Sequence, residues 1–189
     1  MKSLSDKVVR PGVFLITGVM ASGKSTVAQL LAERFERGVH VRGDIFRRMI
    51  VSGREEMLPT PSQEAERQLL LRHRLTAAVA DTYHASGFTV VAQDIIIGPL
   101  LTEVIHMIRS RPLYVVVLCP SIERIAQREA DRQKKGYGVW SIEELDRQLR
   151  LETERVGLWL DTSDQTPQQT VETILSRAPV EAQIVERQS

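Results

Sequence analysis

Residues 13–35 read VFLITGVMASGKSTVAQLLAERF, and their pattern indicates the fold class. The first five residues, VFLIT, favour a short buried strand, and residues 24–36 carry apolar side chains at helical spacing. The turn between them has the pattern Gly18-x-x-x-x-Gly23-Lys24-Ser25, which is the spacing of a phosphate-binding loop. A strand before the loop and an amphipathic helix after it are the context that this motif requires.

The residue types of this turn suit a polyphosphate. Glycines let the backbone curl around an anion, and the N-terminus of the following helix adds its positive dipole end. The lysine is expected to reach the β- and γ-phosphates, and Ser25 to bind Mg²⁺. The alternative is a Gly-rich turn that matches the phosphate-loop pattern by chance. A dinucleotide-binding fold is excluded, because its G-x-G-x-x-G spacing is absent. The predicted nucleotide-binding residues here are Gly18, Ala21, Ser22, Gly23, Lys24, Ser25 and Thr26.

Apolar strands alternate with helices along the rest of the chain. This order predicts one α/β domain over residues 1–189, with a five-stranded parallel sheet flanked by helices and ligands at the carboxyl ends of its strands. The tail 179–189 has no evident partner and is expected to be frayed. The other expected strands are 39–43, 88–94, 112–119 and 156–161, and the other expected helices are 44–53, 61–86, 99–110, 121–135, one from Ser141 and one from Thr166.

Composition narrows the class of protein. The net charge of +1 gives no bulk electrostatic case for a nucleic-acid or membrane partner. A single cysteine, Cys119, excludes an internal disulfide and a thiolate zinc cluster. No apolar run approaches the length of a membrane span, and the N-terminus lacks a signal-peptide pattern, so a cytoplasmic protein is expected. The oligomeric state is left open.

On the phosphate loop and its flanking elements, the chain resembles the small P-loop kinases of the nucleoside-monophosphate-kinase-like group. That group includes gluconate and shikimate kinases, polynucleotide kinase domains and chloramphenicol phosphotransferase. The resemblance covers roughly residues 13–177, and the loop is its most specific part. It implies a P-loop NTPase fold, ATP and Mg²⁺ as cofactors, and a helical Arg-rich lid over about residues 121–140.

Asp44 follows the second expected strand in VRGDIFRRM. In polynucleotide kinases and chloramphenicol phosphotransferase an Asp similarly placed takes the proton from the acceptor hydroxyl, so the resemblance implies that Asp44 is the general base. An N-cap for the next helix is the alternative. Arg47 is expected on the same helix face as Asp44 and would bind the acceptor, with Arg48 pointing elsewhere. A salt bridge to Asp44 or a solvated side chain is the alternative for Arg47.

Asp94 ends the third expected strand, in VVAQD. This ending resembles the paired acidic ending of the corresponding strand in chloramphenicol phosphotransferase, with Gln93 in place of the first acid. A carboxylate here could bind the substrate or a Mg²⁺-bound water. The alternative is a helix-capping role.

Arg124, Arg128 and Arg132 recur every four residues on the charged helix and form one stripe. By resemblance, Arg128 and Arg132 belong to the lid and stabilise the charge of the transferred phosphoryl group. A solvated helix face is the alternative. The stretch DTSDQTP resembles the loop that passes the adenine in this group, which implies nucleotide contacts for Thr162 and Ser163. Capping of the last helix is the alternative there.

These features predict an ATP-dependent phosphotransferase acting on a hydroxyl of a small molecule that is antibiotic-, sugar- or metabolite-like. Two alternatives are kept: a polynucleotide 5′-hydroxyl kinase and a non-catalytic nucleotide-binding switch. Helix 61–86 is expected to wall the acceptor cleft and to supply apolar side chains, which favours a partly apolar acceptor. Those side chains are Leu69, Leu70, Leu75, Val79 and Tyr83.

Overall fold

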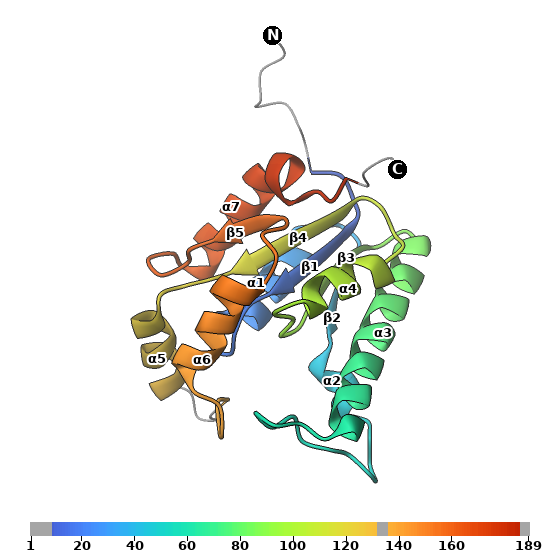
Figure 1. Cartoon of the computed structure of the whole chain (residues 1–189). Coiled ribbons are helices and arrows are strands. Elements are labelled where there is room, and N and C mark those ends of the chain that lie inside the picture. The colour runs from blue at the N-terminus through green and yellow to red at the C-terminus, as the bar shows by residue number, and fades with distance from the viewer. Residues whose placement is uncertain (1–8, 132–135, 186–189) are drawn as a thin grey trace.

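The computed structural model describes residues 9–131 and 136–185. Each strand is followed by at least one helix before the chain continues (Figure 1). The strands are β1 (Val13–Thr17), β2 (Gly38–Arg42), β3 (Thr89–Gln93), β4 (Leu113–Leu118) and β5 (Leu158–Leu160). The α-helices are α1 (Lys24–Ala32), α2 (Asp44–Arg48), α3 (Gln63–Ala85), α4 (Leu100–Met107), α5 (Ile122–Ala130), α6 (Ile142–Arg147) and α7 (Pro167–Arg177), and two π-helical turns are η2 (Gln148–Glu152) and η3 (Ala178–Ala182).

The five strands form one sheet in the order β2-β3-β1-β4-β5, and every neighbouring pair is parallel. The predicted parallel sheet is therefore confirmed. β1 lies between β3 and β4, with Ile16 opposite Gln93 on one side and Val116 on the other. Because all strands run the same way, the segments that follow β1, β2 and β3 come together at one edge of the sheet.

Side chains alternate between the two faces of the sheet and enter two separate cores. Val13 and Leu15 of β1 belong to the cluster that includes residues of α3 and α4. Phe14 and Ile16 belong to the cluster that includes residues of α1 and α7. Every residue of β1, β3 and β4 is buried, because helices cover both faces, which explains why these strands read as uninterrupted apolar runs.

Side-chain caps fix the start of two helices. Thr166 forms a capping box at the start of α7, with Pro167 in the first turn. The N-cap of α3 is Ser62, because the Ser62 hydroxyl accepts a hydrogen bond from the Ala65 N–H at 3.0 Å. The expected helix over 61–86 therefore begins at Gln63.

The C-terminal segment docks on the rest of the fold, so the expected frayed tail is wrong for residues 179–184. Ala178 and Ala182 of η3 are fully buried in the cluster formed with α1 and α7. Gln183 then bridges to Tyr114, and the Ile184 N–H donates to the carbonyl of Leu113 at 2.8 Å. Pro179 is also buried, whereas Val180 and Val185 are exposed. Residues 186–189 lie outside the described part.

The expected lid region, 121–140, is described only in part. α5 ends at Ala130, several residues before the predicted end of that helix at 135. Residues 132–135, including Arg132, lie outside the described residues. α5 and α6 lie on one side of the carboxyl edge of the sheet, and α2 and α3 lie on the other (Figure 1). Within the described chain, no helix has the length and apolar character needed to cross a membrane.

The docked C-terminal segment gives a stability prediction. Ala182→Asp places a carboxylate at a fully buried position and is expected to destabilise the fold by about 3 kcal/mol, because the charge has no buried partner. Glu181→Ala is the control, since Glu181 only forms an exposed pair with Arg177. Chemical denaturation of both variants measures the difference. Equal stability of the two variants would show that the segment does not dock.

Candidate active site

The phosphate loop follows β1 in a conformation that few side chains allow. Gly18, Ala21 and Gly23 all have positive φ, at 147°, 58° and 97°. A Cβ on Gly18 would lie 2.4 Å from the carbonyl oxygen of Leu118, so the loop packs directly against the end of β4. These residues curl the backbone into the concave shape that a phosphate-binding loop needs.

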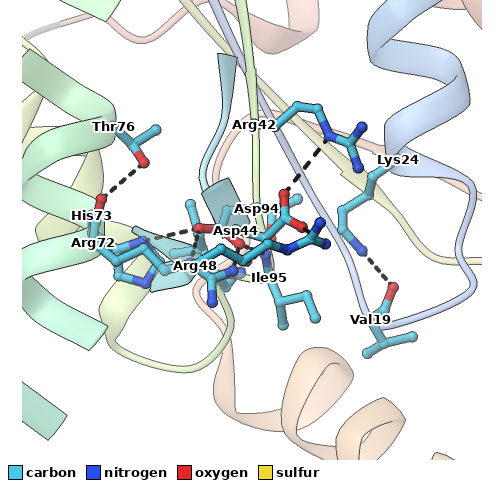
Figure 2. Close-up of polar contacts among 12 residues, drawn as sticks. Val19, Lys24, Arg42, Asp44, Arg48, Arg72, His73, Thr76, Asp94 and Ile95 are labelled. Carbon is cyan, nitrogen blue, oxygen red and sulfur yellow. Dashed lines mark hydrogen bonds and ion pairs between the residues drawn. The ribbon is translucent and has the colours of Figure 1, made fainter. Parts of the chain in front are cut away.

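The loop leads into the N-terminus of α1, where Gly23 is the N-cap and offers no side-chain hydrogen bond. No capping side chain therefore competes for the N–H groups of the first turn, which suits an anion. The Lys24 ammonium donates to the carbonyl of Val19 at 2.7 Å and so lies over the loop itself (Figure 2). Ser25 and Thr26 are exposed at the head of the helix.

Arg128 joins the phosphate loop to the loop after β5. It donates to the carbonyl of Ser22 at 3.3 Å and to the carbonyl of Thr162 at 2.9 Å. Burial, and then the nearby charge of Arg124, lower the pKa of Arg128 from its ordinary value. Of the predicted stripe, Arg128 is thus beside the phosphate loop, whereas Arg124 contacts the carbonyl of Ser163.

Asp44 stands at the start of α2, across the sheet edge from the phosphate loop. Its Oδ2 accepts from Arg48, and its Oδ1 lies 3.7 Å from Nε of Arg42 (Figure 2). The expected geometry of the two helix arginines is wrong: Arg48 pairs with Asp44, while Arg47 pairs with Glu56. On a helix both the i+3 and the i+4 side chains are neighbours of residue i, and here Glu56 binds Arg47 and leaves Arg48 to pair with Asp44.

Asp94 lies just beyond β3 and is almost fully buried. Nε of Arg72 donates to its Oδ2 at 2.6 Å and Nη2 of Arg72 binds its Oδ1, while the Ile95 N–H also donates to Oδ1 at 2.8 Å. Asp94 is therefore a buried ion-pair partner. The sequence analysis did not identify Arg72, which sits in the middle of α3, although its charge within an apolar segment was a signal.

Burial sets the protonation of the two neighbours on α3. Desolvation lowers the pKa of Arg72 to about 10, with Arg47 and Arg48 lowering it further and Asp44 opposing them. Desolvation, together with the charge of Arg72, lowers the pKa of His73 to about 3. At neutral pH Arg72 is therefore a cation and His73 is a neutral ring, 3.7 Å from Asp94.

A cleft of about 390 Å³ at the carboxyl edge of the sheet is lined by the phosphate loop, Asp44, Arg72, Asp94 and Arg128. Arg72 is its only lining residue from α3 among the described residues, so the expected apolar wall from that helix is wrong. Leu75 and Tyr83 are exposed and Val79 packs against the core. The lining residues are Met20, Ala21, Gly23, Lys24, Ser25, Thr26, Arg42, Asp44, Arg48, Arg72, Gln93, Asp94, Ile95 and Arg128.

A second hollow of about 350 Å³ lies between α5 and the loop after β5. Ser163 lines it, and Arg128 lines both this hollow and the cleft. Ser163 accepts from the Ser121 N–H at 2.8 Å, and the side chain of Thr162 is buried. The two residues predicted to contact the nucleotide are therefore adjacent to the hollow, but only Ser163 lines it.

The residues present fit a magnesium ion only in part. In the ranges 9–131 and 136–185 no group of three His, Cys, Asp or Glu side chains could hold a metal by itself. Mg²⁺ commonly uses one or two protein ligands together with substrate phosphates and waters. The exposed Ser25 suits that arrangement, whereas both oxygens of Asp94 already bind Arg72.

The comparisons with known proteins show the family. Residues 13–155 match the family described as "AAA domain". The chain belongs to this family. The matched region contains the phosphate loop, Asp44, Asp94 and Arg128, and the chain has the P-loop NTPase fold that the sequence predicted.

Individual relatives place this AAA-domain chain among small P-loop proteins. A UPF0200 protein of Aeropyrum pernix is 29% identical over 144 residues, which cover 70% of this chain and 71% of that protein. The structure of a sugar kinase from Janibacter sp. HTCC2649 matches with a TM-score of 0.65 at 19% identity, over 88% of this chain and 93% of that one. The tunicamycin resistance protein of Deinococcus radiodurans matches with a TM-score of 0.62 at 15% identity, over 94% and 100%. At such identities the two structures establish a shared kinase-like P-loop fold.

Gly43 offers a test of how the Arg72–Asp94 pair is positioned. A Cβ at this position would lie 2.1 Å from Oδ2 of Asp94, so Gly43→Ala must displace the carboxylate and is expected to cost about 1–3 kcal/mol of stability. In an Asp94→Ala background the added cost should largely disappear. A double-mutant cycle by chemical denaturation measures this coupling. Equal costs in both backgrounds would contradict the described contact.

Proposed function

We propose that this protein is a kinase that transfers the γ-phosphoryl group of ATP to a hydroxyl of a small molecule. One observation carries the proposal: a single cleft is lined by the phosphate loop with Lys24 and Arg128, and also by the carboxylate of Asp44. A nucleotide-binding switch needs only the phosphate loop and its cations, without the Asp44 carboxylate. The added carboxylate supplies a proton acceptor beside the place where the terminal phosphate would lie.

The phosphate-loop side of the cleft would hold the donor. The N–H groups of the loop and of the first turn of α1 would bind the β- and γ-phosphates, and Lys24 would leave the carbonyl of Val19 to reach them. Arg128, already beside Ser22, would stabilise the charge that develops during transfer. Arg132 is proposed for the same role from the sequence alone. Thr162 and Ser163 are proposed to lie near the base of the nucleotide.

The Asp44 side would hold the acceptor. The acceptor oxygen attacks the γ-phosphorus, the bond from that phosphorus to the β–γ bridging oxygen breaks, and ADP leaves. Asp44 takes the proton of the attacking hydroxyl. Arg42 and Arg48 keep Asp44 at the cleft. Arg47 was predicted to bind the acceptor, and it could do so only by leaving Glu56.

A magnesium ion is part of the proposal. When bound, it would neutralise charge on the transferred phosphoryl group. Ser25 is the proposed protein ligand, with Asp94 as a second candidate that would have to share or give up its pair with Arg72. Since the reaction consumes ATP, we also propose a cytoplasmic protein.

The fold comparisons support a small acceptor. The similar structures include one named as a sugar kinase and one named as a tunicamycin resistance protein. The cleft volume of about 390 Å³ is of the order found for small-molecule sites. A polynucleotide acceptor would need further cationic contacts along its backbone.

The proposal is tested by following ³²P from [γ-³²P]ATP and Mg²⁺ into a panel of sugars, hydroxy acids, nucleosides, hydroxylated antibiotics and 5′-hydroxyl oligonucleotides. We expect transfer to a small molecule by the wild type and no transfer by Lys24→Ala, which should remain folded by circular dichroism. Transfer that is unchanged in Lys24→Ala would contradict the proposed site. Preferred labelling of the oligonucleotide, with a steep decrease in salt, would favour the polynucleotide alternative.

Asp44→Asn tests the general base. With the acceptor found in that panel, kcat is expected to fall by about 10²–10⁴-fold, because the amide cannot accept the proton. The affinity for ATP, measured by calorimetry, should barely change. Glu64→Gln is the matched control, since this exposed carboxylate pairs with Arg67 and does not line the cleft. A variant that keeps its kcat and loses ATP binding would make Asp44 a structural residue.

A further inference from the structure

Residues 136–140 form a turn that contacts three separate parts of the fold. The turn lies between α5 and α6. None of these five described residues lines the cleft. Each of the three contacts is made by named hydrogen bonds, so the turn is a fixed part of the surroundings of the cleft.

The buried carboxylate of Glu129, near the end of α5, holds the start of the turn. Its Oε1 accepts hydrogen bonds from the Gly136 N–H and from the Tyr137 N–H, the second at 3.3 Å. The Tyr137 side chain is buried in the core cluster against which Met20 and Ala21 of the phosphate loop also pack. The turn is therefore anchored with its tyrosine directed towards that loop.

The Tyr137 hydroxyl donates to the carbonyl of Met20, in the phosphate loop, at 2.9 Å. In a planar trans peptide the carbonyl and the N–H point in opposite directions, so this bond turns the Ala21 N–H away from Tyr137. Ala21 lines the cleft and has a φ of 58°, a conformation that a Cβ disfavours. Among residues 9–131 and 136–185 the Ala21 N–H makes no hydrogen bond, which leaves it available to an anion.

Trp140 connects the same turn to the other half of the cleft. Its backbone N–H donates to the carbonyl of Tyr137 at 2.8 Å, and its Nε1 donates to the carbonyl of Met57 at 3.1 Å. Met57 belongs to the segment between α2 and α3, which reaches towards the start of α6 (Figure 1). One turn thus binds both the phosphate loop and the segment that precedes α3.

The segment around Met57 is in turn tied to the helix that carries the proposed general base. Glu56 pairs with Arg47 of α2, and α2 begins at Asp44. The turn 136–140 therefore joins the nucleotide half and the acceptor half by contacts that run outside the cleft.

We propose that Tyr137 and Trp140 are positioning residues: Tyr137 orients the phosphate loop for the nucleotide, and Trp140 couples the loop to the segment around Met57. The proposal rests on the binding of ATP at this loop, as proposed above. Because the Tyr137 hydroxyl holds the peptide of Ala21 in place, a phosphate meets an N–H that needs no reorientation. A nucleotide that stabilises this arrangement also stabilises the turn and, through Trp140, the acceptor-side segment.

Tyr137→Phe tests the orientation of the loop, since it removes only the hydroxyl. By calorimetry we expect the Kd for ADP with Mg²⁺ to rise by about 3- to 10-fold, the range that one lost hydrogen bond gives. Tyr83→Phe is the matched control, because Tyr83 is exposed on α3 and its hydroxyl makes no hydrogen bond within the described chain. The melting temperature of each free variant shows whether the fold is intact. An unchanged Kd in Tyr137→Phe would overturn the proposal.

Trp140→Phe tests the coupling, and it decides the proposal if Tyr137→Phe does not fold. ADP with Mg²⁺ is expected to slow amide hydrogen exchange of residues 53–58 by about 3- to 10-fold in the wild type, but not in Trp140→Phe, which lacks Nε1. Trp159→Phe is the matched control and should behave like the wild type, because Nε1 of Trp159 donates locally, to the carbonyl of Val156 at 3.2 Å. Equal slowing in Trp140→Phe, or no slowing in the wild type, would contradict the coupling.

Both measurements use ADP without an acceptor, which separates this proposal from the kinase function. If both give the expected results and no acceptor is phosphorylated, the positioning roles stand and the kinase function fails. If transfer is found while Tyr137→Phe and Trp140→Phe match their controls, the proposal is wrong and the kinase function stands. A wild type that does not bind ADP with Mg²⁺ would overturn both.

Discussion

The central position of β1 is the constraint on which the site depends. β1 is completely buried between β3 and β4, and all its neighbours are parallel to it. The chain must therefore leave β1 at the same edge at which it leaves β3 and β4, in contact with both. Thr17 illustrates this: its hydroxyl exchanges hydrogen bonds with the backbone of Ile96, beyond β3, at 2.7 and 2.9 Å. Gly18 then packs against the last carbonyl of β4. Because a side chain at this position would collide with that carbonyl, the phosphate loop can pack against the end of β4 only with glycine here.

The charges of the cleft follow from that arrangement. The phosphate loop contributes Lys24. β2 ends at Arg42 and β3 ends at Gln93, and each strand is followed within two residues by a carboxylate. These carboxylates would repel a polyphosphate if they stood alone. They are instead paired with arginines from two different helices, Arg48 of α2 and Arg72 of α3. The cleft as a whole thus remains positive while keeping a carboxylate in position for acid–base chemistry, which is the combination that phosphoryl transfer to a hydroxyl requires.

The sequence predicted what depends on local pattern. The phosphate loop, the five strands and the position of Asp44 after β2 all follow from spacing within short segments, and each of these elements is found. The predictions from the sequence failed for features that depend on contacts between distant segments of the chain. Arg72 was not identified because it meets Asp94 across 22 positions of the chain. The positions of Arg47 and Arg48 were wrongly predicted because helical spacing allows either side chain to lie beside Asp44, and the choice depends on Glu56, which lies beyond the helix.

The tail shows the same limit. Its small apolar residues are buried against the cluster around Phe14, and its backbone bonds to the start of β4, which β5 does not reach. Neither contact can be predicted from residues 179–185 themselves. The roles of Lys24, Arg128 and Asp44 in chemistry remain predictions, since geometry places them together without showing what they bind. The same holds for the expected lid.

The most direct measurement is a crystal structure of the protein with ADP, Mg²⁺ and tetrafluoroaluminate, an analogue of the phosphoryl group in the transition state of transfer. The account predicts that the β-phosphate lies in the phosphate loop. It also predicts that Lys24 moves from the carbonyl of Val19 to the phosphate, and that the fluoride analogue lies between Lys24 and Asp44. A nucleotide bound away from this loop, or an analogue that faces away from Asp44, would contradict it.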